Sequence, residues 1–224
     1  RIRLLKMFAL VTGGSKGIGK SISDYLHKKN YTVITVGQFN NATKMGDIND
    51  VNFRNTLVAN WKPDIFINNA GIAKEEFNKV LSTNGLASVD LLQKFYQKMD
   101  NGHIINIGSL ATTQNGYQVK DMEDTSYILS KKLLHNASYF LQEMHTKPIR
   151  VTSLELGAVN TSIKNRFHNK EISESEYTEQ TLRSIPMKTD DVVNAIDWIL
   201  NLPKHLEVRN IQLNNFVKPD GKRK

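Results

Sequence analysis

Short apolar runs rich in β-branched residues alternate along this chain with stretches whose apolar residues recur at helical spacing. This pattern predicts strands at 7–11, 32–36, 65–67, 103–107, 150–156 and 210–213, and helices over 18–26, 77–99, 125–144 and 190–200. Strands that alternate with helices are joined by helical crossovers and run parallel. We therefore predict a doubly wound parallel α/β sheet in three α/β/α layers. Ligands of such sheets bind beyond the carboxyl ends of the strands.

Composition narrows the classes of protein that this chain can form. Its 224 residues suit one domain, and the absence of cysteine excludes disulfides and thiolate catalysis. The net charge of +8 comes from scattered lysines and a cluster at 218–224, which indicates a solvated surface and a basic tail at 214–224 rather than a nucleic-acid site. No apolar run approaches the roughly 20 residues that span a bilayer. We expect a cytoplasmic protein with no metal and no membrane or nucleic-acid partner.

A glycine-rich segment, TGGSKGIG at 12–19, lies between the first predicted strand and the first predicted helix. A dinucleotide pyrophosphate needs a close backbone approach and free N–H donors at a helix N-terminus, and glycines permit both. A plain turn would have a similar composition. The strand before, the helix after and a second strand ending near Val36 supply the context that a nucleotide-binding turn requires.

The spacing T-G-x-x-x-G-x-G resembles the cofactor signature of the short-chain dehydrogenase/reductase family. Thr12, Gly13, Gly17 and Gly19 match it. The resemblance implies a Rossmann-type fold that binds NAD(P) over residues 1–224, with a cofactor half at 7–110 and a catalytic and substrate half at 111–213. The implied cofactor contacts in this turn are Gly13, Ser15, Lys16, Gly17, Ile18 and Gly19.

The end of the second predicted strand bears on the choice of cofactor. Residues 36–40, VGQFN, offer no carboxylate to hold the ribose hydroxyls or to repel a 2′-phosphate. Lys16 stands where NADP-using members of the family often have a basic residue, whereas Gln38 replaces the arginine that many of them carry. We predict a preference for NADP(H), with NAD(H) as the alternative.

A second set of residues resembles the family's wall around the cofactor. Residues 68–71, NNAG, match a motif that lines the cofactor, and Asp47 with Ile48 match its adenine contact. The segment between Val36 and Asp47 is shorter than a helical crossover, so we predict that the helix usual there is lost or reduced to a turn. The implied cofactor contacts are Gln38, Asp47, Ile48, Asn69, Ala70 and Gly71. By themselves, NNAG is a turn and Asp47 an ordinary loop residue.

The segment SYILSK at 126–131 contains the sharpest chemical signal. Tyr127 and Lys131 are spaced to share one helix face, and a nearby ammonium stabilises a phenolate and lowers its pKa. The chain contains a second such pair, Tyr25 and Lys29, so the spacing is not specific. Ser109, after the strand at 103–107, and Asn84, within the helix at 77–99, complete the family's tetrad of Asn84, Ser109, Tyr127 and Lys131.

The resemblance assigns a role to each tetrad residue. Ser109 polarises the substrate carbonyl, and Tyr127 donates a proton as hydride arrives. Lys131 also holds the nicotinamide ribose, which makes Tyr127 and Lys131 cofactor contacts as well. Asn84 holds a water that links Lys131 to solvent.

Downstream segments depart from the family in two places. The interval from Ser109 to Tyr127 is longer than usual, and we place the insertion at 117–125, where it either borders the substrate or forms a solvated loop. Residues 156–161, LGAVNT, resemble P-G-x-V-x-T with leucine for proline, which makes Val159 and Thr161 nicotinamide contacts. Residues 162–185 match the family's substrate-binding segment and are interpreted as a lid.

These observations predict an NADP(H)-dependent oxidoreductase that transfers hydride between the nicotinamide and a carbonyl or secondary alcohol of a small molecule. The alternative is a dormant NADP-binding regulatory or scaffolding protein, against which the intact tetrad argues. Family members pair through two long helices, here 84–99 and 126–144, so we expect a homodimer or homotetramer.

Overall fold

The computed structural model of the chain describes residues 6–112, 121–162 and 186–215. Seven strands of this part form one sheet, in which all paired strands are parallel and the order is β3-β2-β1-β4-β5-β6-β7. They are β1 Phe8–Thr12, β2 Thr32–Gly37, β3 Lys44–Met45, β4 Ile65–Asn68, β5 Gly102–Ile107, β6 Ile149–Leu156 and β7 Asn210–Leu213. The predicted doubly wound Rossmann-type sheet is confirmed.

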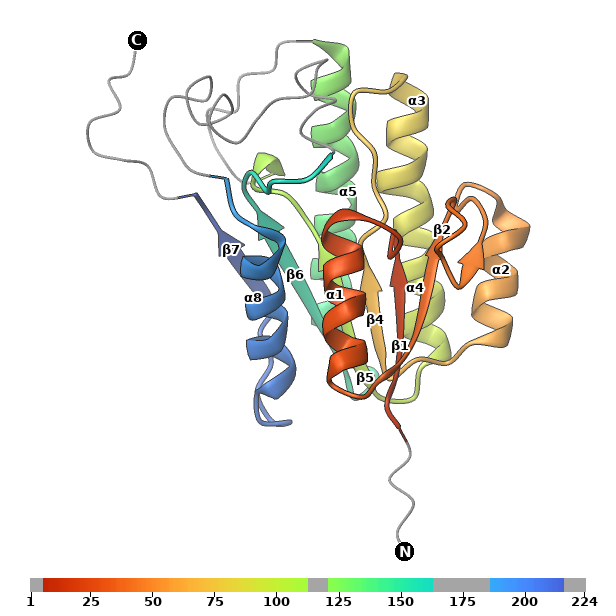
Figure 1. Cartoon of the computed structure of the whole chain (residues 1–224), viewed down its shortest axis with the longest axis vertical. Coiled ribbons are helices and arrows are strands. Elements are labelled where there is room, and N and C mark those ends of the chain that lie inside the picture. Colours follow the sequence, from red (N-terminus) through yellow and green to blue (C-terminus); the bar gives the residue numbers. More distant parts are fainter. Residues whose placement is uncertain (1–5, 113–120, 163–185, 216–224) are drawn as a thin grey trace, which may run out of the picture.

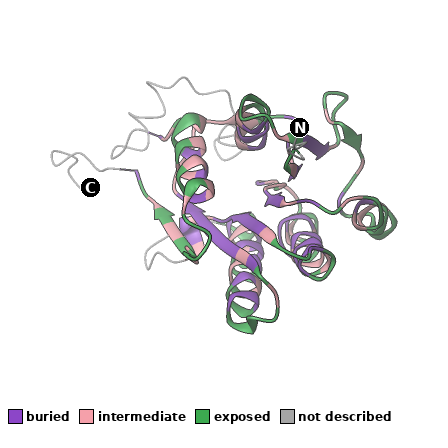
Figure 2. Cartoon of the chain, turned by 90° about the horizontal axis from the view of Figure 1, so that it is seen from below, coloured by how far each residue is buried: buried purple, intermediate pink, exposed green. Residues whose placement is uncertain are grey.

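Helices cover both faces of this sheet (Figure 1). They are α1 Gly17–Lys28, α2 Val51–Asn60, α3 Phe77–Val80, the π-helical turn η1 Leu81–Ala87, α4 Ser88–Lys98, the 3₁₀ turn η2 Leu110–Thr112, α5 Met122–Met144 and α8 Thr189–Asn201. Helices α1 and α8 pack on one face, and α2, α4 and α5 on the other. Figure 2 shows the buried residues concentrated in the strands and on the inward sides of the helices.

The alternation of strand side chains produces two hydrophobic cores. Val11, Ile67 and Ile105 point to the α1 and α8 side, where they meet Ile22 and Ile196. Their strand neighbours Leu10, Phe66 and Ile104 point to the other side and belong to the cluster that contains Phe95 of α4 and Leu134 of α5. Sheets buried on both faces need such apolar runs, which is why the strands were predictable from sequence.

The strand order changes direction at β1, which pairs with β2 on one side and with β4 on the other. The chain therefore leaves the carboxyl ends of β1 and β4 next to each other. Parallel α/β sheets bind ligands at such a switch point. The segments 13–19 and 69–71 both begin here.

The region between β2 and α2 confirms the predicted loss of a crossover helix. Residues 38–43 form turns and bends, and the short strand β3 pairs parallel to β2, with Val36 opposite Lys44. Helix α2 itself was not predicted. Leu57 is its only buried residue, so its sequence lacks the apolar stripe by which a helix is recognised.

Two predicted helices differ from the structure in detail. The helix over 77–99 is present but is interrupted by the π-helical turn η1, which sequence patterning does not reveal. The last helix of the tetrad region, α5, begins at Met122 rather than at residue 125. Asp121 caps it by accepting a hydrogen bond from the Asp124 backbone N–H at 2.7 Å, and Glu123 and Asp124 place negative charge in its first turn. Residues 121–125 of the predicted insertion thus include the start of a helix.

Other predicted features lie outside the described residues. These are the remainder of the insertion up to residue 120, most of the lid segment 162–185 and the basic tail from residue 216. In the described part, no helix combines the length and hydropathy that crossing a bilayer requires.

Candidate active site

The glycine turn after β1 is bound to the turn after β4 through one buried hydroxyl. Thr12 Oγ1 accepts hydrogen bonds from the backbone N–H groups of Asn69 at 2.9 Å and Ala70 at 3.1 Å. Asn69 Nδ2 returns a bond to the Thr12 carbonyl at 2.9 Å, and Gly13 N–H donates to the Val36 carbonyl at 2.8 Å. The predicted phosphate turn and the NNAG turn therefore form one structure at the switch point.

Two glycines of the phosphate turn have positive φ, +66° at Gly13 and +55° at Gly17, a conformation that other residues rarely adopt. A Cβ at Gly19 would overlap the Gly13 carbonyl oxygen, so the turn closes tightly onto the start of α1. Ile18 lies in the first turn of that helix, where unpaired N–H groups favour an anion. The backbone fits a pyrophosphate.

The opposite wall comes from the segment after β6. A Cβ on Gly17 would lie 3.6 Å from Thr161 Cγ2, so the phosphate turn faces Thr161 closely. Val159 is held in place by a parallel bridge to Met187, in which Asn160 N–H and Met187 N–H bond the neighbouring carbonyls. Val159 and Thr161 thus lie on the same side of the sheet as the glycine turn.

The residues predicted to contact the adenosine end are mostly exposed. Lys16 directly precedes α1, and its Nζ lies 4.1 Å from the centroid of the Phe39 ring. Gln38 follows β2 directly and is exposed. Ser15 is buried, and its carbonyl accepts a bond from Asn41 Nδ2 at 2.6 Å, which fastens the loop after β2 to the phosphate turn. Sequence analysis did not identify Asn41.

Asp47 and Ile48 have environments that their predicted roles did not include. The Asp47 carboxylate is exposed and accepts bonds from the backbone and side chain of Asn49 at 2.9 and 3.1 Å. The Ile48 side chain is buried in the hydrophobic core. The Asp47 carboxylate is therefore bonded within its own turn, and the Ile48 carbonyl accepts a hydrogen bond from Arg54 Nη1 at 2.5 Å.

Lys131 lies at the carboxyl end of β5 and is almost completely buried. Its Nζ donates a hydrogen bond to the Ile107 carbonyl at 2.9 Å and lies 6.0 Å from the centroid of the Tyr127 ring. Burial lowers the pKa of Lys131 to about 8, while attraction to the Glu155 carboxylate opposes the shift. The predicted pair is therefore together, with an amine whose protonation changes close to neutral pH.

Asn84 lies in the π-helical turn η1 and has no exposed surface. Its side-chain oxygen accepts a bond from Ile72 N–H, and its Nδ2 donates to the Ile72 carbonyl, both at 2.8 Å. A Cβ on Gly71 would lie 3.4 Å from Asn84 Oδ1 and 3.7 Å from Lys131 Nζ. The structure thus brings Asn84, Gly71 and Lys131 to one point, and π-helical turns are frequent at functional sites.

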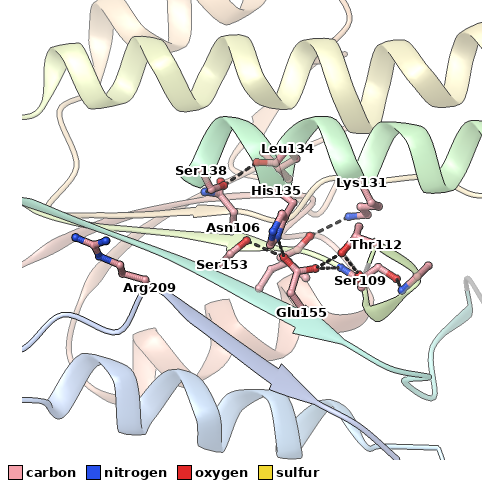
Figure 3. Close-up of polar contacts among 12 residues, drawn as sticks. Asn106, Ser109, Thr112, Lys131, Leu134, His135, Ser138, Ser153, Glu155 and Arg209 are labelled. Carbon is pink, nitrogen blue, oxygen red and sulfur yellow. Dashed lines mark hydrogen bonds and ion pairs between the residues drawn. The ribbon is translucent and has the colours of Figure 1, made fainter. Parts of the chain in front are cut away.

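Ser109 follows β5, two residues beyond the carbonyl that Lys131 contacts (Figure 3). Its backbone N–H donates to Glu155 Oε2 at 2.7 Å, and its hydroxyl oxygen accepts a bond from Ala111 N–H at 3.3 Å. That contact leaves the hydroxyl proton available for a substrate. Glu155 was missed by sequence analysis, although a lone acidic residue near the end of an apolar strand was a signal that could have identified it.

The start of α5 is joined to the loop after β4 by ion pairs. Lys74 Nζ lies 2.6 Å from Asp121 and 2.9 Å from Asp124, and only 12% of the Lys74 side chain is exposed. These contacts fix the helix that carries Tyr127 relative to the NNAG turn. Among the described residues, no group of three potential ligands is arranged to hold a metal ion.

Comparison with known proteins agrees with this arrangement. The family model described as short chain dehydrogenase matches residues 47–172. The chain is 26% identical to human dehydrogenase/reductase SDR family member 11 over 92% of each chain. It is 27% identical to the NADP-dependent 3-hydroxy acid dehydrogenase YdfG of Shigella flexneri, over 92% of this chain and 94% of that protein.

Solved structures share the fold. A closed form of serine dehydrogenase complexed with NADP⁺ superimposes with a TM-score of 0.74 at 22% identity, covering 97% of this chain and all of that one. A 4-hydroxyisoleucine dehydrogenase complexed with NADH gives a TM-score of 0.76 at 20% identity, covering 94% of this chain and 98% of that one. At these identities the likeness concerns the fold alone.

Proposed function

The chain belongs to the short chain dehydrogenase family, and from this premise we propose that it interconverts a carbonyl compound and a secondary alcohol with NADP(H), using Tyr127 as the general acid and base. Membership makes it an oxidoreductase that acts on CH–OH or C=O groups of a small molecule with a nicotinamide cofactor. One observation carries the proposal: the buried Lys131 amine beside the Tyr127 ring.

The proton chemistry follows from this pair. A bound reduced nicotinamide supplies the hydride. Tyr127 gives its phenolic proton to the carbonyl oxygen, and the Lys131 ammonium stabilises the phenolate that remains. Because burial makes that ammonium easy to deprotonate, Lys131 is suited to pass a proton on. The Ser109 hydroxyl donates a hydrogen bond to the same carbonyl oxygen without transferring its proton, and this hydrogen bond strengthens as negative charge develops on the oxygen.

Asn84 serves this site by position. Both edges of its amide are fixed by Ile72, so the π-helical turn is held against Gly71 and Lys131. We assign Asn84 the role of holding the water molecule through which Lys131 exchanges protons with solvent. The two hydrogen bonds to Ile72 hold the Asn84 side chain rigidly, and general acid–base catalysis requires such precise positioning.

The preference for NADP(H) rests on charge. Residues 37–46 contain no acidic residue, and Lys16 stands at the start of α1, with Phe39 stacked on its amine. An ammonium here attracts a 2′-phosphate, whereas a carboxylate at Gln38 would have repelled it. The NADP⁺ complex of a serine dehydrogenase and the NADH complex of a 4-hydroxyisoleucine dehydrogenase show that this fold accommodates either cofactor.

A carbonyl screen with both cofactors tests the proposal. We expect oxidation of NADPH by one or more aldehydes or ketones, with kcat/KM at least about tenfold higher than with NADH. Lys16→Met should lower kcat/KM for NADPH about tenfold, as expected for loss of one charge-assisted contact. Lys20→Met is the matched control, because Lys20 is exposed and pairs with Asp24 on the same helix.

Three outcomes would contradict parts of this proposal. A clear preference for NADH would refute the cofactor assignment. Equal losses of kcat/KM for NADPH in Lys16→Met and Lys20→Met would show that Lys16 acts only through the net positive charge of the surface. Tight NADPH binding without turnover of any carbonyl would favour the dormant binding protein over the enzyme.

We also propose that the whole chain forms one cofactor-binding domain and that it assembles as a homodimer or homotetramer through α4 and α5. Large apolar side chains remain exposed along η1 and α5, as expected of a surface that a second copy covers. They are Leu86, Met122, Leu129, Leu133, Tyr139, Phe140 and Met144. Light scattering of the purified chain measures the assembly directly, and a monomer at micromolar concentration would overturn it.

A further inference from the structure

A carboxylate lies beneath the turn that carries Ser109. Glu155 is near the end of β6 and has no exposed surface. Burying a charged group is unfavourable unless other groups compensate the charge. The chain nevertheless places this carboxylate in a strand whose residues 151–156 are all buried.

Both oxygens of the Glu155 carboxylate accept hydrogen bonds (Figure 3). Oε2 accepts from Ser109 N–H at 2.7 Å and, at 3.4 Å, from Thr112 Oγ1. Oε1 accepts from Ser153 Oγ at 2.8 Å and lies 2.8 Å from His135 Nδ1. The carboxylate therefore joins the Ser109 turn, β6 and α5, all of which border the end of β5.

Gly108 leaves room for this arrangement. A Cβ at this position would overlap the Glu155 carboxylate, so no other residue fits without moving it. Gly108 N–H also donates to the Leu154 carbonyl at 2.9 Å, which fixes the turn immediately before Ser109. The backbone at residues 108–109 is thus bonded to β6 at two successive points.

The titratable side chains that face Glu155 come from α5. His135 contacts Oε1 directly, and the Lys131 ammonium attracts the carboxylate, which raises the pKa of Lys131 against the effect of burial. From the other packed elements the described neighbours are neutral: Ser109 and Thr112 beyond β5, Ser153 on β6, and Gln212, which is in register with Glu155 on β7. Glu155 is therefore the local negative counterpart of Lys131.

We propose that Glu155 is a positioning residue for the proposed active site. Its carboxylate holds the Ser109 backbone in place and supplies the buried negative charge that keeps Lys131 cationic. This inference rests on the proposed function, because Ser109 and Lys131 are its targets. A purely structural role would require only the hydrogen bonds of Glu155. The proposed role also requires its negative charge, and loss of that charge should change the pH dependence of kcat.

Glu155→Gln tests the charge at constant shape. Removal of a negative charge makes the Tyr127–Lys131 pair lose its first proton at lower pH. With NADPH and 2,3-butanedione as the carbonyl probe, we expect the alkaline limb of the kcat profile to move down by about 0.5–1 pH unit. We also expect kcat to fall about 10–100-fold as the Ser109 turn loosens, with the Kd for NADPH unchanged.

Glu155→Asp tests the reach at constant charge, and it decides the question if the Gln variant does not fold. The shorter side chain keeps the charge near Lys131 but withdraws it from Ser109. We expect kcat to fall while the alkaline limb stays within about 0.2 units of wild type. A wild-type kcat in Glu155→Asp would contradict the proposal that Glu155 positions the Ser109 backbone.

Asp90→Asn is the matched control for loss of a carboxylate. Asp90 lies on α4, where it contacts Arg54 and Lys94 and takes no part in the proposed chemistry. It should leave kcat and the alkaline limb unchanged. If Glu155→Gln behaves in the same way, with only its melting temperature lowered, the positioning role is wrong.

Tyr127→Phe in the same assay separates the two proposals. If it is as active as wild type, the proposed function fails and the Glu155 role fails with it. If it is inactive and Glu155→Gln retains the wild-type rate and profile, only the Glu155 role fails.

Discussion

Two Tyr–Lys pairs with the same helical spacing lie at opposite ends of the strands. Tyr25 and Lys29 stand at the end of α1, next to the start of β2, whereas Lys131 and Tyr127 lie on α5 at the end of β5 (Figure 1). In each pair the amine lies near the aromatic ring, 5.5 Å from the Tyr25 centroid and 6.0 Å from the Tyr127 centroid. Spacing and distance therefore do not distinguish them.

The neighbouring residues distinguish the two pairs. The Tyr25 hydroxyl donates to Asp197 of α8, and Lys29 Nζ lies 3.1 Å from the same carboxylate. Burial and the nearby carboxylate raise the pKa of Tyr25 well above its usual range, so its phenol keeps its proton. The Lys131 amine instead donates a hydrogen bond to the Ile107 backbone carbonyl, and burial lowers its pKa to about 8. Helix spacing brings the pair together, and the third partner decides whether it can exchange protons.

The largest expected difference between the pairs is in turnover. Tyr127→Phe should lower kcat about 10²–10⁴-fold, because it removes the general acid while keeping the ring. Cofactor binding should persist. Steady-state rates and the Kd for NADPH, measured side by side, separate the two effects.

Tyr25→Phe is its matched control, since it removes a hydroxyl with the same spacing to a lysine. It should change kcat less than about twofold, because surface changes away from the site have small effects. Comparable losses in both variants would break the comparison and with it the assignment of Tyr127.

The second expected difference is in stability and its dependence on pH. The fall in the pKa of Lys131 from 10.5 to about 8 means that its ammonium is unfavourable in the folded state by roughly 3 kcal/mol at pH 7. Lys131→Met should therefore raise the free energy of unfolding at pH 7 by about 1–3 kcal/mol, after about 1 kcal/mol is lost at the Ile107 carbonyl. Between pH 8 and 10.5 the unfolded wild-type chain binds more protons than the folded one, so wild-type stability rises with pH there.

Urea unfolding of wild type and Lys131→Met at pH 7 and pH 10 measures this difference. The advantage of the variant should shrink at the higher pH, while its activity is lost at both. Lys29→Met should change stability only slightly, because that pair is half-exposed. An advantage of Lys131→Met that is independent of pH would show that packing, rather than charge, explains it.

The sheet and its motifs were predictable because their signals are local. The strand at 103–107 is buried on both faces, and three of its five residues are isoleucine. The turn at 12–19 is rich in glycine because its backbone closes tightly onto the start of α1. Tyr127 and Lys131 needed only helical spacing and the resemblance to a family. Their roles remain predictions, whereas their proximity is observed.

The remaining features depend on contacts between distant segments. The π-helical turn at Asn84 is fixed by the Ile72 backbone, twelve residues earlier, and Glu155 becomes part of the site only when β6 lies beside β5. The Tyr25 pair could not be dismissed from sequence, because Asp197 is 172 residues away from it. No periodicity within one segment carries that information.

The smallest expected effect concerns Asp197 itself. Asp197→Asn should leave kcat unchanged and bring the pKa of Tyr25 down toward its usual value, because the nearby charge is removed. Difference titration of phenolate absorbance against Tyr25→Phe detects this change for one tyrosine.

Tyr25 and Lys29 lower the pKa of Asp197, so its contribution to stability is present above pH 4 and is lost as the pH falls further. The melting temperatures of wild type and Asp197→Asn should therefore differ slightly at pH 7 and converge at pH 3. A loss of turnover in this variant would mean that the α1–α8 pair supports catalysis after all, and that the third partner does not separate the two pairs.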